Sequence, residues 1–113
     1  MAKVEIAEPL KNEILNKFGQ ESKIIFRKMY SLEENPKKGN PLGQVAGIVI
    51  KELKYKSYRF YFITDGHKLK IMSLEQLSDL LIKFVRISDK KSQQKTINEI
   101  KDVLKKVGRE GFG

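Results

Sequence analysis

The segment KELKYKSYRFYF, residues 51–62, combines aromatic rings and positive charges more densely than a core strand or a solvated loop requires. It holds three tyrosines, two phenylalanines, three lysines and one arginine. Lysine and arginine side chains bind phosphate groups, and a tyrosine ring can stack on a base, so these residue types together suit a nucleic acid, above all RNA. Their use depends on how the fold sorts the rings from the charges.

A predicted hairpin sorts them onto two faces. Asp65-Gly66 stands between the alternating runs YRFYFIT and HKLKIMS, and Asp-Gly in that position is a strong hairpin signal. Because side chains alternate along a strand, a two-residue turn puts four apolar side chains on one face, which we expect to be core: Phe60, Phe62, Leu69 and Ile71. The opposite face receives basic and aromatic side chains: Arg59, Tyr61, Lys68 and Lys70.

We expect helices to cover the apolar face and leave the basic face open to a polyanion. The alternative is that the basic face only meets water, since lysines on strands also discourage edge pairing. For Lys68 and Lys70 both interpretations stay open. Arg59 favours a function, because it stands between Tyr58 and Phe60 in mid-strand.

The remaining segments predict the elements that position this hairpin. Apolar spacing and turn residues predict three more strands, at 4–7, 45–50 and 82–88. They also predict a helical hairpin at 9–34, one or two helical turns at 74–81 and a last helix at 96–107. The start signals of the last two are the possible capping boxes Ser73–Gln76 and Thr96–Glu99. We therefore expect an α+β fold with a small twisted, mainly antiparallel sheet, an N-terminal helical hairpin and a C-terminal helix. A single domain would span residues 1–108, with a flexible tail at 109–113.

Composition narrows the classes of function. The chain has 113 residues, a formal net charge of +9 and no cysteine. The charge favours a polyanionic partner, namely RNA, DNA, a ribosome or an acidic protein. The lack of cysteine excludes a thiol nucleophile and a cysteine zinc site, and a single histidine, His67, disfavours a histidine metal site. No apolar run is long enough for a membrane span and no secretory signal is visible, so the cytoplasm is the expected location.

Three segments, in this order, resemble the RelE/HigB-type toxins of bacterial and archaeal toxin–antitoxin systems: LEENPKKGNPL, IKELKYKSYRFYFITDGHKLKIM and DKKSQQKTINEIKDVLKK. The family pattern is a helical hairpin ending in an Asn-Pro loop, a Glu-Leu-Lys/Arg strand, a Tyr-Arg-aromatic strand, a hydrophobic strand, a Lys-Lys segment and a last helix. The resemblance extends from about Glu8 to Val107, and YRF with ELK upstream is its most specific part. It implies a small twisted antiparallel sheet with helices packed on one face.

The resemblance also implies an activity. Active members of the family bind the ribosomal A site and cut mRNA by attack of a ribose 2′-OH on the neighbouring phosphate. That reaction needs a base for the hydroxyl, cations for the charge on the phosphorane and an acid for the leaving 5′-oxygen. The expected partners are mRNA on the ribosome and an acidic cognate antitoxin, with no cofactor, metal or membrane.

The family's functional residues carry over to a few positions of this chain. Arg59 matches the phosphate-binding arginine, Lys54 matches a basic strand residue beside it, and Glu52 matches a carboxylate that serves as the base in some members. These three are the expected catalytic residues, together with one that we infer from the strand pattern below.

Two further positions concern phosphate binding and one concerns catalysis. Lys90 and Lys91 match the family's Lys-Lys segment, so they join Lys68, Lys70 and Tyr61 as expected RNA contacts. We add Arg86 to the catalytic set, because Phe84 and Arg86 share one parity on the strand at 82–88 and Arg86 can thereby reach the same face as Arg59.

The sequence also departs from the family pattern. SLEQLSDLL, residues 73–81, intervenes before the fourth strand as an insertion, and no tyrosine or histidine follows His67 where some members have a late catalytic residue. Three alternatives remain. The chain is a gyrase-inhibiting toxin of the ParE type, a non-catalytic RNA-binding module similar to a double-stranded RNA-binding domain, or a structural partner protein whose charge keeps it soluble.

Overall fold

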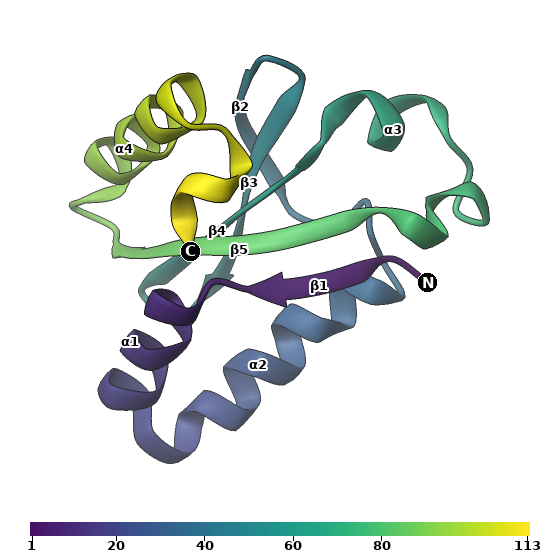
Figure 1. Cartoon of the computed structure of the whole chain (residues 1–113). Helices are drawn as coiled ribbons and strands as arrows, with labels where there is room; N and C mark the ends of the chain where they lie inside the picture. The colour runs from purple at the N-terminus through teal and green to yellow at the C-terminus, as the bar shows by residue number, and fades with distance from the viewer.

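A five-stranded mixed sheet organises the chain, which the structure, a computed structural model, describes from residue 1 to residue 113. The strands are β1 (Lys3–Ile6), β2 (Asn40–Val45), β3 (Ile48–Tyr55), β4 (Tyr58–Asp65) and β5 (Leu81–Asp89). Their order across the sheet is β1-β5-β4-β3-β2. β1 runs parallel to β5, and the other neighbours are antiparallel (Figure 1). The α+β class and the mainly antiparallel sheet are confirmed.

Four α-helices and four 3₁₀ turns complete the fold. The helices are α1 (Glu8–Phe18), α2 (Ser22–Tyr30), α3 (Gly66–Ile71) and α4 (Gln93–Lys106). The 3₁₀ turns are η1 (Gly19–Glu21), η2 (Ser31–Glu33), η3 (Gln76–Asp79) and η4 (Arg109–Phe112). The predicted helical hairpin is confirmed, with Pro9 in the first turn of α1, where its missing N–H costs nothing. None of these helices has the length and hydrophobicity that a bilayer-spanning segment requires.

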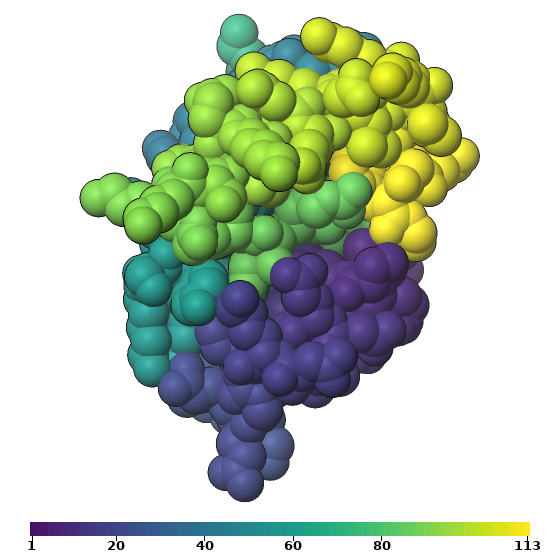
Figure 2. Space-filling model, turned by 90° about the vertical axis from the view of Figure 1, so that its left-hand side faces the viewer, coloured from purple at the N-terminus to yellow at the C-terminus, as the bar shows by residue number.

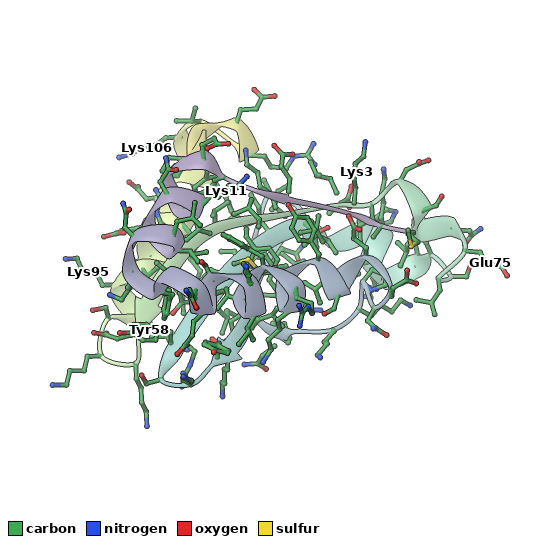
Figure 3. All side chains as sticks on the ribbon, turned by 90° about the horizontal axis from the view of Figure 1, so that it is seen from below. Lys3, Lys11, Tyr58, Glu75, Lys95 and Lys106 are labelled. Atoms are coloured by element: carbon green, nitrogen blue, oxygen red, sulfur yellow. The ribbon has the colours of Figure 1, made fainter.

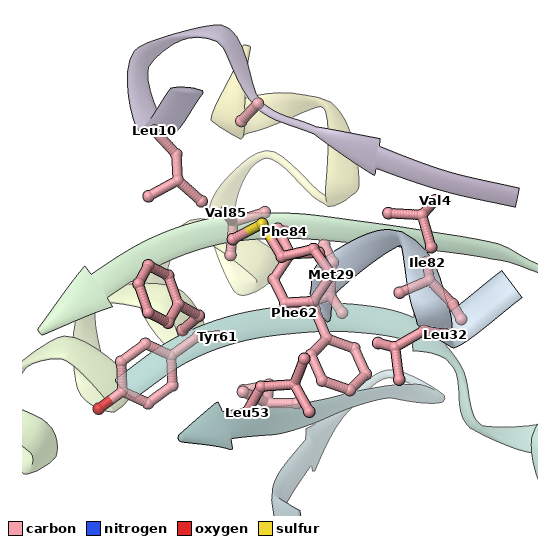
Figure 4. Packing of buried hydrophobic residues seen from close by; sticks show 14 of the residues in the cluster. Val4, Leu10, Met29, Leu32, Leu53, Tyr61, Phe62, Ile82, Phe84 and Val85 are labelled. Carbon is pink, nitrogen blue, oxygen red and sulfur yellow. The ribbon is translucent and has the colours of Figure 1, made fainter. Parts of the chain in front are cut away.

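The helices lie on both faces of the sheet. The hairpin of α1 and α2 covers one face, and α4 covers part of the other (Figure 1). Under the hairpin the rings of Phe62 and Phe84 lie 4.9 Å apart, and Met29 of α2 and Leu32 of η2 pack beside them (Figure 4). Phe60 and Phe62 are buried there as predicted. The expectation that the opposite, basic face stays open is wrong, because α4 lies over it.

The prediction of a hairpin turn at Asp65-Gly66 is also wrong. Asp65 caps α3 instead, because its Oδ1 accepts a hydrogen bond of 3.0 Å from the backbone N–H of Lys68. Aspartate is favourable both as a helix N-cap and as a turn residue, so the dipeptide Asp65-Gly66 is compatible with a helix start as well as with a hairpin turn. HKLKIMS is therefore a short helix and its continuation, not a strand. In consequence Leu69 is only half-buried and Ile71 is 59 % exposed.

The hairpin turns lie elsewhere. β2 and β3 meet at Ala46-Gly47, so VAGIVI is a turn followed by a strand and not one continuous strand. Ala46 and Gly47 have φ values of 49° and 83°, as a two-residue hairpin turn of the right twist requires. β3 and β4 meet at Lys56-Ser57.

The C-terminal region differs from expectation at both its ends. α4 begins at Gln93, so Thr96–Glu99 is not its capping box. The other predicted capping box is confirmed, because Ser73 and Gln76 exchange its two hydrogen bonds. Residues 109–112 form η4, in which Phe112 is 3 % exposed within the core. Packed structure thus continues beyond residue 108, where we expected a flexible tail to begin.

Candidate nucleic-acid interface

Arg59 stands near the start of β4 in a row of three paired residues. Its neighbours across the sheet are Lys54 of β3 and Ser88 of β5. Directly paired residues of antiparallel strands point to one face, so Arg59 and Lys54 share the face that α4 partly covers. The Lys54 side chain is exposed, whereas that of Arg59 is 12 % exposed. The resemblance put Lys54 beside Arg59, and the structure pairs the two residues although the predicted hairpin is absent.

Glu52 lies two residues before Lys54 on β3, on the same face of the sheet, beneath the first turn of α4. Its Oε1 is 3.7 Å from Arg59 Nε, and its Oε2 accepts a hydrogen bond of 3.0 Å from Gln93 Nε2. Only 1 % of the Glu52 side chain is exposed. Arg59 Nε is buried without a hydrogen-bond partner, so the guanidinium keeps unused donor capacity. Glu52 is thus beside Arg59, as expected, but enclosed.

Tyr61 is paired with Glu52 across the sheet and is completely buried. Its hydroxyl lies 2.7 Å from Ser88 Oγ. Burial raises the pKa of Tyr61, with the hydrogen bond to Ser88 acting in the opposite direction. The ring therefore presents no surface on which an RNA base can stack in this arrangement.

The loop after β5 brings two more lysines to the same end of the sheet. Tyr58 pairs with Asp89, so Lys90 and Lys91 follow directly beyond that pair. Asp89 Oδ1 accepts a hydrogen bond of 2.8 Å from the backbone N–H of Ser92, which turns the chain into α4 and holds the pKa of Asp89 below its usual range. Both lysines are exposed and neither forms a salt bridge.

We call this cationic region the basic end, and it comprises Lys17, Lys54, Lys56, Arg59, Lys90 and Lys91. Lys17, from the last turn of α1, lies 5.0 Å above the ring of Tyr58. Lys56 is bridged to Glu21 at 2.9 Å. Figure 3 places Tyr58 and Lys95 at one end of the molecule and Glu75 at the other. In Figure 2 the β5–α4 loop protrudes beside the β3–β4 turn, at the left of the view.

The other expected site residues lie outside the basic end. Arg86 is half-buried, donates from Nη1 to the backbone oxygen of Val85 at 2.9 Å and stacks 5.0 Å above the ring of Phe112. Lys68 and Lys70 are exposed on α3, which belongs to the end of the sheet away from Arg59. The structure thus brings Lys54, Glu52 and the Lys90-Lys91 loop to Arg59. Arg86 is paired with Tyr61 one row away, and Lys68 and Lys70 lie elsewhere.

Sequence reasoning missed two contributors to this region. Gln93 hydrogen-bonds Glu52, and Lys17 reaches the ring of Tyr58 from a helix far away in the sequence. A long-range contact of this kind leaves no local signal in the sequence. The polarity of QQ at the start of the last helix was compatible with a solvated helix entry.

Comparisons with known proteins do not place the chain: no family model, no curated protein and no solved structure matches it. No group of three or more histidine, aspartate or glutamate side chains is placed to hold a metal ion. The arrangement offers exposed lysines around one partly covered arginine, which suits binding of successive phosphate groups.

Proposed function

We propose that the chain is a RelE-like toxin that binds mRNA on the ribosome through the basic end and cleaves it. The observation that carries the proposal is the pairing of Arg59 with Lys54 beside the unpaired Lys90-Lys91 loop. Four cations of the basic end, Lys17, Lys54, Lys90 and Lys91, have no acidic partner within the chain. An acidic antitoxin is the protein partner that such a surface would bind.

The order of the elements supports a RelE-like variant of the α+β fold. A helical hairpin, the strand with ELK, the strand with YRF, a hydrophobic strand, two lysines and a last helix follow one another as in the family pattern. Two features depart from that pattern. α3 and η3 stand between β4 and β5, and α4 packs on the face opposite to α1 and α2.

Within this proposal the residues of the basic end have separate roles. Arg59, with its unused donors, stabilises the charge that develops on the phosphorane, and Lys54, Lys90 and Lys91 bind the flanking phosphates. Glu52 takes the proton of the 2′-OH as its oxygen bonds to phosphorus, and the bond from phosphorus to the 5′-oxygen breaks, with water supplying the proton that this leaving oxygen takes up. For that role the hydrogen bond between Gln93 and Glu52 must open, because the carboxylate is otherwise enclosed.

The enclosure of Glu52 favours a second candidate, an RNA-binding protein without cleavage activity. Neither Glu52 nor Tyr61 reaches the surface, so only the cations of the basic end are available to a ligand as the chain stands. Lysines and one arginine bind phosphates without cutting them. The two candidates therefore agree on where RNA binds and differ on whether a base becomes accessible.

Ribosomes programmed with a defined mRNA distinguish the two. The wild-type protein should cut the mRNA and leave a 2′,3′-cyclic phosphate, and Arg59→Ala should cut about a hundred- to a thousand-fold more slowly, as expected for loss of one transition-state contact. Lys105→Ala, near the far end of α4, is the matched control and should cut at the wild-type rate. The proposed site is wrong if Arg59→Ala retains full activity.

Binding supplies the second readout. If the wild-type protein binds RNA with strong salt dependence and leaves the mRNA uncut on ribosomes, the non-catalytic candidate replaces the toxin. If it does neither, the basic end is not an RNA interface.

A further inference from the structure

Lys51 of β3 is a buried cation with little to neutralise it. It alternates with Glu52 and Lys54, so it points to the other face of the sheet, and it is 4 % exposed. Its Nζ donates to the backbone oxygen of Lys37 at 2.9 Å, and it forms no salt bridge. An ammonium has three N–H donors, and buried charges are normally paired. Desolvation by burial accordingly lowers the pKa of Lys51.

A pocket of about 440 Å³ lies beside this ammonium, between the β2–β3 hairpin and α3. It is lined by Lys37, Pro41, Gln44, Val49, Lys51, Gly66, Leu69 and Lys70. Three of these are lysines, and none is an aspartate or a glutamate. The volume falls within the range of roughly 300–1,000 Å³ that is usual for small-molecule sites. A hydrogen bond of 2.9 Å from Gly66 N–H to the Gly47 carbonyl ties the start of α3 to the hairpin beside it.

We propose that this lysine pocket binds a small organic phosphate of the nucleoside monophosphate class. The phosphate meets Lys51 at the base of the pocket and Lys37 and Lys70 at its rim. The flat apolar part of the ligand lies against Val49 and Leu69. A pocket with three cations and no carboxylate selects an anion, and its apolar wall selects one that carries an organic group.

The proposal is independent of the basic end, because none of the residues named there lines this pocket. A phosphate with an attached base has two sources, a free nucleotide or one unit of an RNA chain. The chemistry that the pocket recognises is the same in both. The experiment below separates them by competition.

Adenosine 5′-monophosphate is the probe, titrated into the full-length chain by isothermal titration calorimetry. The wild-type protein should bind it at one site. Lys51→Met retains the side-chain length without the charge and should weaken binding at least tenfold. Lys70→Ala changes an exposed rim residue, so it tests the pocket without touching the core. Lys11→Met, on α1, is the control and should bind as the wild type does.

Thermal unfolding of each variant tests whether the fold is retained. The proposal is overturned if millimolar adenosine monophosphate gives no heat with the wild-type protein, or if Lys51→Met and Lys70→Ala both bind as the wild type does. A short single-stranded RNA without terminal phosphates is then added as competitor. Displacement of the nucleotide by that RNA overturns the free-nucleotide form and assigns the pocket to an RNA chain, and failure to displace it supports a free ligand.

Discussion

Lys51 and Glu52 are neighbours in the sequence, but the alternation of β3 sends them to opposite faces of the sheet. Glu52 is enclosed under α4 with Arg59 and Gln93 as partners. Lys51 is enclosed on the side of α3 with one carbonyl as its partner. Burial of a charge is unfavourable when its partners are few, so the two side chains contribute unequally to stability. Lys51 is the one whose charge the fold tolerates least.

The free energy of unfolding should therefore depend on pH through Lys51. Desolvation lowers its pKa in the folded chain from the ordinary value of 10.5. Between the lowered pKa and the ordinary value the unfolded chain binds more protons at this site, so stability rises as pH increases through that window. Below the window both states carry the proton and the dependence disappears. Urea denaturation at a series of alkaline pH values measures the slope.

Lys51→Met provides the comparison for this titration. In the variant the free energy of unfolding should rise less with increasing pH, because Lys51 no longer contributes. The variant should also be more stable than the wild type at neutral pH, because the buried charge is gone. Lys37 and Lys70 line the same pocket and are present in both proteins, so the comparison isolates Lys51. Parallel slopes in the two proteins would show that Lys51 is not desolvated.

Among the elements, the strand β4 was predictable from the sequence, whereas the positions of the turns were not. The alternation of YRFYFIT identified β4 and its buried Phe60 and Phe62, because period-2 burial is a local property. Asp65-Gly66 was ambiguous, because an N-cap and a hairpin turn use the same residues. The true β2–β3 turn was hidden, because Ala46 is a rare residue at positive φ.

A substitution in the Ala46-Gly47 turn should make the folded chain more stable. Ala46 has a φ of 49°, a left-handed conformation that costs an ordinary residue roughly 1–2 kcal/mol and costs asparagine less. Ala46 is exposed, so Ala46→Asn loses no packing and should raise the free energy of unfolding by about 1 kcal/mol, as measured by urea denaturation.

Gly47→Ala is the opposing variant. Its φ of 83° is unfavourable for any residue with a Cβ, so this substitution should lower stability. An unchanged midpoint for both variants would mean that the turn lies at other residues.

At the scale of the whole molecule, the two chain termini close the structure around β5. Phe112 of η4 is 3 % exposed and lies below the guanidinium of Arg86 on β5. Phe112→Ala should lower the free energy of unfolding by about 3–5 kcal/mol, since it removes a buried aromatic ring. The matched control is Val107→Ala at a position 65 % exposed, which should change stability by less than about 0.5 kcal/mol. If Phe112→Ala were as harmless as the control, the last residues would not be part of the core.

The candidate site was predictable only in part. The family resemblance put Lys54 beside Arg59, and the two residues are paired across β3 and β4. The polyanionic partner that the net charge of +9 favours stays a prediction. The position of α4 was not predictable, because amphipathic spacing shows that a helix has a buried face but not which face of the sheet it covers. For that reason Tyr61 and Glu52 were expected at the surface and are enclosed.

The parallel pairing of β1 with β5 has a consequence for the order of events during translation. Residues 3–6 are synthesised well before their partners at 81–84. At roughly 5–20 residues per second, the first strand of the nascent chain waits several seconds for its neighbour. Arg59 likewise cannot meet Ser88, nor Glu52 meet Gln93, until β5 and the start of α4 have been translated. The nascent chain thus presents Glu52 and Tyr61 uncovered before the finished protein encloses them.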